Sequence, residues 1–312
     1  MSADAETRAL AGAERFEPPA SSARRTLALI VLITGGLGIA SAGIFVRLSE
    51  TGPTATAFWR GALALPCLAV WAAWESWRNR ARGARRSPRR LDVRFFWSGL
   101  FFAGDLALWH WSLLMTSVAA STLEANLAPV LVSAIAWVVW RERPRPQFLL
   151  ALALALAGVV LIVVPKLGGS GRALTGDLLG IATAGFYAGY ILVVSRLRAV
   201  HGTGAVMLWT TLIFTALLLP LALTQKFLPD TAHGWVLLVG LALTAQFFGQ
   251  GMIAYALAHL PPTYGSIGLY VQPVGAAVYA RLILGERLAP VQIAGAAIVL
   301  AAIVLARRSQ SA

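Results

Sequence analysis

The chain has 312 residues, of which 58% are hydrophobic and only 12% are charged. A soluble domain carries about 25% charged residues, so most of this chain is expected to contact lipid rather than water. The net charge of +13 comes mostly from arginines in short loops between apolar runs. This placement is typical of residues that orient a protein in the membrane and not of a nucleic-acid-binding face, so we expect no nucleic acid as a partner.

Ten apolar runs predict ten transmembrane helices, and their continuity favours helices over the alternating segments of a membrane β-barrel. The runs are 26–48, 54–77, 95–115, 119–140, 148–164, 178–195, 205–223, 235–258, 264–284 and 291–306. Residues 1–23 are polar and lack the basic and apolar regions of a signal peptide, so we expect a disordered cytoplasmic tail.

The fourth and fifth runs return as the ninth and tenth at a shift of 144 residues, which places Pro129 on Pro273 and Glu142 on Glu286. Shared prolines and a shared Glu-Arg-x-x-Pro hinge at one shift indicate an internal duplication. We interpret the two hinge glutamates as loop or helix-capping residues rather than ligands.

The duplication divides the chain into two five-helix repeats, 24–165 and 174–308. Because five is odd, the two halves must cross the bilayer in opposite directions, and the fold class predicted is an all-α membrane protein with two inverted five-helix repeats. Placing both termini in the cytoplasm puts 19 of the 26 basic residues on that side, which favours this orientation in a bacterial-type inner membrane.

A polar pattern is shared by the third and eighth helices. Asp105 lies near the middle of the third helix with Trp109 one turn later on the same face, and a shift of 141 pairs them with Gln246 and Gln250. Polar residues at matched depth in both halves predict a shared substrate cavity. The alternative is that these side chains only tie helices together by hydrogen bonds.

Three further ionisable residues are expected at membrane depth, where a charge needs a partner or a water-filled cavity. Glu124 is a candidate both for proton coupling and for binding a substrate ammonium, with His110 at a similar depth as its possible partner. An interfacial glutamate in water is the alternative. Arg60 would bind a substrate carboxylate, extend to the outer membrane interface or pair with a buried acid. Arg47 is expected at the membrane interface.

Pro129 and Pro273 each remove one backbone hydrogen bond from a helix, so we interpret them as hinges. The carbonyl groups that they free, together with Asn126 and Gln272 beside them, would offer hydrogen bonds to a substrate. The alternative is that the prolines only shape the bundle.

Deep aromatic residues are expected to form the walls of the cavity for a planar or cationic substrate. The candidates are Trp109, Tyr190, Tyr255 and Tyr270. The sequence contains no HExxH, GxSxG or P-loop motif, and its single cysteine, Cys67, provides no metal set. We therefore expect no enzyme, no cofactor and no metal site.

The chain resembles the drug/metabolite transporter superfamily, in its ten-helix exporter branch. The resemblance is carried by ASTLEANLAPVLVSAIAWVVWRERP, by GERL with GAAIVLAAIVL after it, and by GIFVRLSETGPTATAFWRGALALP, in which Arg47 and Arg60 occupy family-like positions. Arg141 stands where a glycine is commoner. The resemblance implies an inner-membrane exporter of amino acids, metabolites or drugs, most similar to the aromatic-amino-acid exporters.

These observations predict a secondary transporter that exports aromatic or neutral amino acids, related metabolites or cationic drugs by alternating access. Its partners would be a small-molecule substrate and the lipid bilayer, and a monomer is among the states that the sequence allows. A translocator of phosphorylated or nucleotide sugars and a non-transporting membrane subunit are the alternatives.

Overall fold

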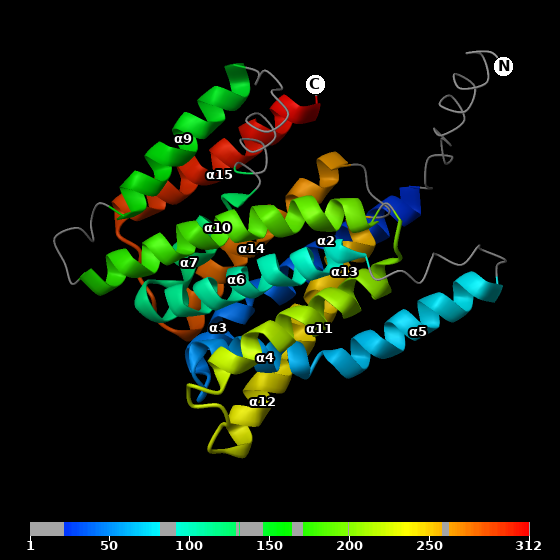
Figure 1. Cartoon of the computed structure of the whole chain (residues 1–312). Coiled ribbons are helices and arrows are strands. Elements are labelled where there is room, and N and C mark those ends of the chain that lie inside the picture. Colours follow the sequence, from blue (N-terminus) through cyan, green and yellow to red (C-terminus); the bar gives the residue numbers. More distant parts are fainter. Residues whose placement is uncertain are drawn as a thin grey trace, which may run out of the picture.

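The structure is a computed structural model that describes residues 22–81, 92–128, 131, 146–163, 171–198, 200–257 and 262–311. The described secondary structure is entirely helical (Figure 1). The side chains of some helical residues, including Tyr270, lie outside this description, as do Pro129 and Glu142 altogether.

Helices lie in each of the ten predicted ranges, although α7 covers only the start of the fourth. The first half contains α2 (Ser22–Ala40), α3 (Ala42–Leu48), α4 (Pro53–Ala62), α5 (Leu65–Ala81), α6 (Val93–Met115), α7 (Val118–Ala125) and α9 (Pro146–Val163). The second half contains α10 (Gly171–Arg198), α11 (Thr203–Ala222), α12 (Ala232–Leu241), η2 (Ala242–Gly249), α13 (Gln250–Leu257), α14 (Pro262–Ile283) and α15 (Pro290–Ser311). The count of ten membrane crossings stays a prediction.

Several of the predicted runs are interrupted. The first run breaks at Ser41, whose hydroxyl donates to the Gly38 carbonyl over 2.7 Å, and the second run breaks in a turn between α4 and α5. The eighth run changes from α-helix to π-helix at Ala242 and back at Gln250. Such π-helical insertions are frequent at functional sites, because they rotate the following side chains relative to a regular helix.

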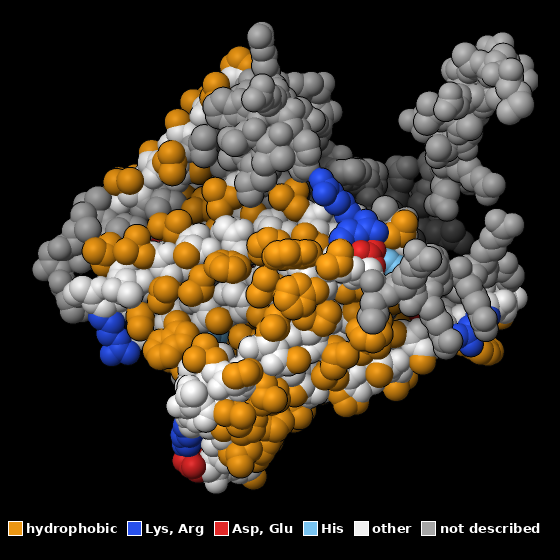
Figure 2. All heavy atoms as spheres, viewed as in Figure 1, with side chains coloured by type: hydrophobic (Ala, Val, Ile, Leu, Met, Phe, Trp, Pro, Cys, Tyr) orange, Lys and Arg blue, Asp and Glu red, His pale blue; other side chains and the backbone are white. Residues whose placement is uncertain are grey.

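The bundle is hydrophobic on its outside. Figure 2 shows a face covered largely by hydrophobic side chains, and Leu282 and Val70 are 76% and 71% exposed. Five described helical segments are long and apolar enough to span a membrane: 26–48, 53–81, 171–198, 203–222 and 232–253. A molecule that exposes apolar residues and buries charged ones is organised for lipid, so the chain is a multi-pass membrane protein.

Helices of the two halves pack against each other throughout the bundle (Figure 1). α6 packs on α10, α4 on α11, and α9 on α15, while α2 contacts α13, η2 and α14. Exchanging the halves maps the α6–α10 pair onto the pair of α2 with η2 and α13. This pairing agrees with a duplicated chain, and the inverted sense of the repeat stays a prediction.

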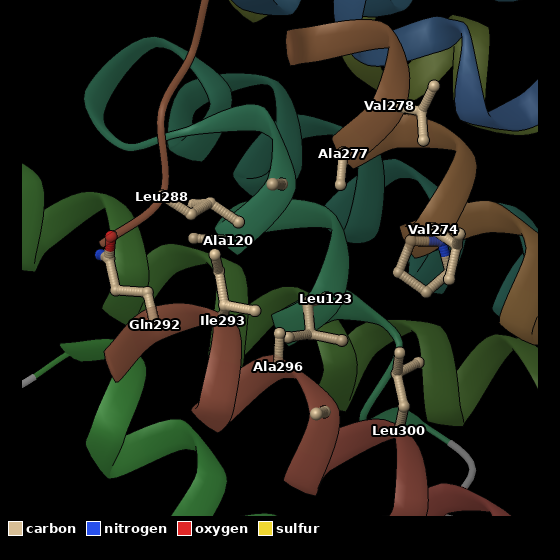
Figure 3. Close-up of a pocket in the computed structure, with 13 residues that line it drawn as sticks. Ala120, Leu123, Val274, Ala277, Val278, Leu288, Gln292, Ile293, Ala296 and Leu300 are labelled. Carbon is tan, nitrogen blue, oxygen red and sulfur yellow. The ribbon is translucent and has the colours of Figure 1, made fainter. Parts of the chain in front are cut away.

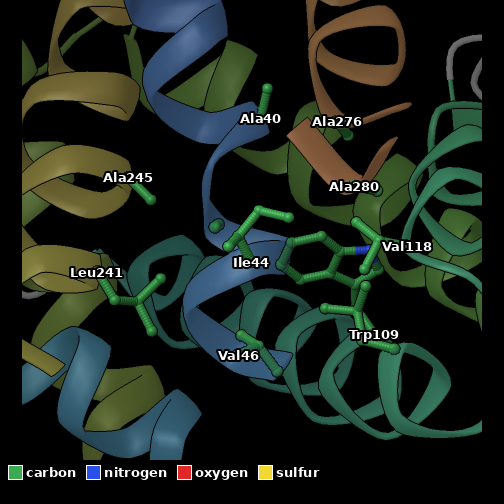
Figure 4. Packing of buried hydrophobic residues seen from close by; sticks show 11 residues of the cluster. Ala40, Ile44, Val46, Trp109, Val118, Leu241, Ala245, Ala276 and Ala280 are labelled. Carbon is green, nitrogen blue, oxygen red and sulfur yellow. The ribbon is translucent and has the colours of Figure 1, made fainter. Parts of the chain in front are cut away.

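One core cluster joins both halves around the end of α6. Ile44 of α3, Trp109 of α6 and Val118 of α7 pack there with Ala276 and Ala280 of α14 (Figure 4). The alanines keep α14 close to α3, since small residues allow close approach of helices in a membrane. The cluster holds Trp109 in place at the edge of a polar cavity.

Candidate substrate-binding site

A cavity of about 50 Å³ lies where helices of the two halves meet. It is lined by residues of α2, α4, α6, α7, α10, α13 and α14, and by Asn126 just after α7. These residues are Ile39, Arg60, Phe102, Asp105, Leu106, Trp109, Thr122, Ala125, Asn126, Tyr187, Gln250 and Gln272. Asp105, Trp109, Asn126, Gln250 and Gln272, which the sequence predicts as substrate-binding, therefore lie around one space.

Arg60 is almost fully buried, with 2% of its surface exposed. Its Nε donates to Oε1 of Gln246 over 3.1 Å, and Gln246 Nε2 in turn donates to Thr211 Oγ1 over 3.1 Å. The amide of Gln246 is thus fixed by two partners, and it orients the guanidinium. Since Gln246 lies in η2, the π-helical segment provides the residue that positions Arg60.

Asp105 lines the same cavity as Arg60 and is 8% exposed. Both side chains line this cavity, yet no direct ion pair joins them in the described part of the chain. A carboxylate and a guanidinium that face one space reduce the cost of burying each other's charge. Both keep hydrogen-bonding capacity that a ligand can use.

Three buried polar atoms at this cavity have no hydrogen-bond partner among the described residues. They are Trp109 Nε1, Thr122 Oγ1 and Gln272 Nε2. Buried polar groups are almost always satisfied by protein, water or ligand. Two of the three atoms are N–H donors, so they would accommodate a ligand that offers hydrogen-bond acceptors.

Asn126 occupies a more structural position. Its Nδ2 donates to the Thr122 carbonyl over 2.8 Å, at the end of α7. α7 ends here in a turn, and Ala128 and Leu131 on either side of Pro129 are helical again, while α14 is continuous through Pro273. Gln272 and Pro273 lie on different sides of α14, because Gln272 lines the polar cavity and Pro273 lines a separate apolar one.

The two proton-coupling candidates lie outside this cavity's lining. Glu124 is fully buried against Gly180 of α10, where any larger residue would overlap its carboxylate. His110 is also fully buried, and its Nδ1 lies 3.1 Å from the Pro53 carbonyl, to which it donates. His110 is therefore bonded to the start of α4 and not to Glu124.

The predicted aromatic residues separate in the structure. Tyr190 stacks on Phe102 with ring centroids 4.6 Å apart and on Tyr187 at 5.8 Å, so it supports two cavity-lining rings from behind. Tyr255 is 42% exposed and does not line the cavity. The side chain of Tyr270 is outside the described residues.

Asp177 is a buried acid that the sequence analysis missed. It is fully buried in α10 and accepts a hydrogen bond from Thr116 Oγ1 over 2.5 Å. The sixth apolar run begins only at Leu178, whereas α10 begins at Gly171 and contains Asp177. A carboxylate directly before a long apolar run was the available signal.

Glu286 confirms the interpretation of its hinge position as a capping residue. Both of its carboxylate oxygens accept from the Val118 N–H at the start of α7, the shorter distance being 3.0 Å. Arg47 pairs with Glu286 over 3.4 Å and also donates to the Thr116 carbonyl. The contact joins the α14–α15 loop to the ends of α3 and α6.

Comparisons with known proteins agree with this architecture. The model of the EamA-like transporter family matches residues 26–164 and again 174–308. An uncharacterized transporter of Archaeoglobus fulgidus is 26% identical over 272 residues, covering 84% of this chain and 89% of its own length. A pseudopaline exporter of Pseudomonas aeruginosa is 24% identical, covering 68% of this chain and 74% of its own.

One solved structure shares the fold. A crystal structure of a protein matches with a TM-score of 0.60 and 18% identity, covering 90% of this chain and 97% of that chain. At this identity the likeness supports the fold alone.

Proposed function

Because the chain belongs to the EamA-like transporter family of the drug/metabolite transporter superfamily, we propose that it exports small zwitterionic metabolites, above all neutral and aromatic amino acids, across the inner membrane. The supporting observation is the cavity in which Asp105 and Arg60 face one space without a direct ion pair. Export, rather than uptake, is favoured by the relative that is named an exporter.

The two charges suit the two ends of an amino acid. The Asp105 carboxylate accepts hydrogen bonds from the substrate ammonium, and the Arg60 guanidinium receives the substrate carboxylate, for which it offers a planar set of donors. The unpaired N–H groups of Trp109 and Gln272 add donors for the same carboxylate. These two N–H groups then gain a hydrogen-bond partner when the substrate binds.

The apolar part of the cavity suits an apolar or aromatic side chain. Phe102, Tyr187 and Trp109 provide aromatic surface there, and Leu106 adds an aliphatic wall. Such rings bind aromatic side chains through stacked or edge-on contacts, and their faces attract cations. Cationic drugs are accordingly included among the substrates that we propose.

The small size of the cavity supports a mechanism of alternating access. A space of about 50 Å³ is small for an amino acid. An amino acid enters only if the surrounding helices move apart, and these helices come from both halves of the chain. We propose that the two inverted halves rock around this cavity to open it to each side in turn.

A phosphorylated or nucleotide sugar is the less suitable substrate. Arg60 is the cavity's only cationic side chain among the described residues, and Asp105 would repel a phosphate dianion. A zwitterion satisfies both charges, whereas a dianion satisfies one.

The proposal is tested with proteoliposomes loaded with radiolabelled Phe, Met or Thr. Faster release with the protein than without it is expected for at least one of the three, and release of none would reject the amino-acid substrate. A sugar phosphate loaded in parallel vesicles tests the alternative. The Asp230→Asn variant is a suitable reference, because Asp230 is an exposed carboxylate outside the cavity.

A further inference from the structure

A second cavity, of about 300 Å³, lies between α7, α14 and α15 (Figure 3). Its lining is apolar except for Gln292 near one end. In Figure 3, Leu123 of α7, Val274 of α14, and Ile293 and Ala296 of α15 lie around the same space. This cavity is too apolar for the zwitterion proposed above, so it calls for a different ligand.

The cavity opens to the outside of the bundle. Val274, Val278 and Ile293 line it and are 49%, 48% and 56% exposed. Since these residues belong to segments predicted to lie in the bilayer, the space beyond them is filled by lipid chains and not by water. A hydrocarbon chain is therefore the ligand chemistry that its walls accept.

Two arginines lie close in the chain to residues that line this cavity. Val274, Val278 and Arg281 are at positions i, i+4 and i+7 of α14, so Arg281 lies on the same face of this helix as the two valines. Arg287 directly precedes Leu288, which lines the cavity, and Gly285, with φ of 67°, lets the chain turn from α14 into the loop that carries Arg287. Both arginines are exposed, and neither forms an ion pair within the described part of the chain.

The arginine end lies at the depth of a membrane surface. Leu282 and Ile283 next to Arg281 are 76% and 58% exposed, and an exposed apolar pair beside an arginine is typical of the level where the hydrocarbon ends. The nearby carboxylate of Glu286 is engaged by Arg47 and by the Val118 N–H. The positive charge of the two arginines is thus available to a ligand.

We propose that this cavity binds an anionic phospholipid. One acyl chain lies between α14 and α15, and the phosphate is bound by Arg281 and Arg287. A guanidinium binds a phosphodiester through paired charge-assisted hydrogen bonds, and basic sites beside transmembrane helices are known to recognise anionic head groups. The match of charge at one end and hydrocarbon along the rest identifies a lipid rather than a soluble anion.

The bound lipid would contact the back of the substrate cavity. Pro273 lines the lipid cavity, while the preceding Gln272 lines the polar one. The two cavities therefore lie on different sides of the same turn of α14, and a lipid in the second cavity would brace the helix that carries Gln272. The lipid site itself does not depend on which metabolite the protein transports.

The test is thermal unfolding of the purified full chain in detergent with increasing amounts of dioleoylphosphatidylglycerol or dioleoylphosphatidylcholine. A ligand of the folded state raises Tm in a saturable manner. The anionic lipid is expected to raise Tm further than the zwitterionic one. The Arg281→Gln/Arg287→Gln variant loses the charge-assisted hydrogen bonds to the phosphate. It should therefore need a lipid concentration roughly tenfold higher or more for the same rise in Tm.

Two other variants separate the cavity from general attraction to charge. Ala296→Phe fills the apolar space and should remove the extra shift although both arginines remain. Arg80→Gln, which changes an exposed arginine on α5, should retain it. The proposal is overturned if both lipids raise Tm equally, or if glycerol phosphate alone raises Tm as much as the anionic lipid. It is also overturned if the Arg281→Gln/Arg287→Gln variant or the Ala296→Phe variant keeps the full extra rise in Tm, or if Arg80→Gln loses it.

Discussion

Arg60 of α4 and Gln246 of η2 are joined by a hydrogen bond of 3.1 Å that links the two halves of the chain beside the polar cavity. Both residues are buried, and Gln246 also donates to Thr211 of α11. The bond explains how an arginine is accommodated inside the bundle: its Nε is satisfied by an amide from the other half, and the rest of the guanidinium is left for the cavity.

The Gln246→Ala variant tests this role of Gln246. Removing the amide leaves the Nε of Arg60 and the hydroxyl of Thr211 without their present partner, and a buried polar group without a partner costs about 1–3 kcal/mol. A lower Tm in detergent is expected. Gln147→Ala, at an exposed position in α9, serves as the matched control and should leave Tm unchanged. Equal Tm values for both variants would show that Gln246 does not support Arg60.

The Glu124→Gln variant tests proton coupling. Glu124 is fully buried beside Gly180, and a buried carboxylate that takes up and releases a proton would make transport depend on pH. Transport by the variant should be reduced and should vary less between pH 5 and pH 8, measured as substrate release from vesicles. Asp230→Asn controls for the loss of one acidic residue. Full transport with the pH profile of the unaltered protein would remove Glu124 from the mechanism.

The acid sensitivity of the fold is expected to depend on Asp92, which caps the start of α6. The hydrogen bonds from Arg94 hold the pKa of Asp92 well below its usual value, and His201 contributes a weaker contact. A lowered pKa in the folded state stabilises the protein above the usual pKa of about 4, and this stabilisation is lost as the pH falls below that value.

The Asp92→Asn variant should therefore lose less stability than the unaltered protein when the pH is lowered from 7 to 3. Tm measured in detergent at both values gives the comparison. An identical fall in Tm for the two proteins would contradict a role for Asp92 in acid sensitivity.

Much of the fold follows from the sequence because lipid imposes strong limits on it. Long apolar runs must be helices in a bilayer, and the family membership of both halves agrees with the repeat that Pro129 and Pro273 indicated. The sequence also brings Asp105, Gln250 and Gln272 to attention because polar side chains at membrane depth are rare, and these three line one cavity; their binding of substrate stays a prediction.

The sequence specifies neither where the backbone departs from a regular α-helix nor which helices pack against each other. The π-helix at 242–249 gives no clear sequence signal, and it is the segment that places Gln246 on Arg60. Helical spacing also assigns a residue to a face without saying which helix covers that face. Helical spacing therefore predicts Tyr255 in the cavity, whereas it is 42% exposed and does not line it.

The most direct test of the proposed site is binding of matched ligands to purified protein by isothermal titration. L-phenylalanine carries both charges, its amide lacks the carboxylate, and its N-acetyl derivative lacks the ammonium. The unaltered protein should bind L-phenylalanine at least about tenfold more tightly than either derivative, because each derivative leaves a buried charge unpaired. The Asp105→Asn variant should no longer prefer L-phenylalanine over its N-acetyl derivative, but it should still prefer L-phenylalanine over its amide. Equal binding of all three ligands, or an unchanged preference in Asp105→Asn, would contradict a site built for zwitterions.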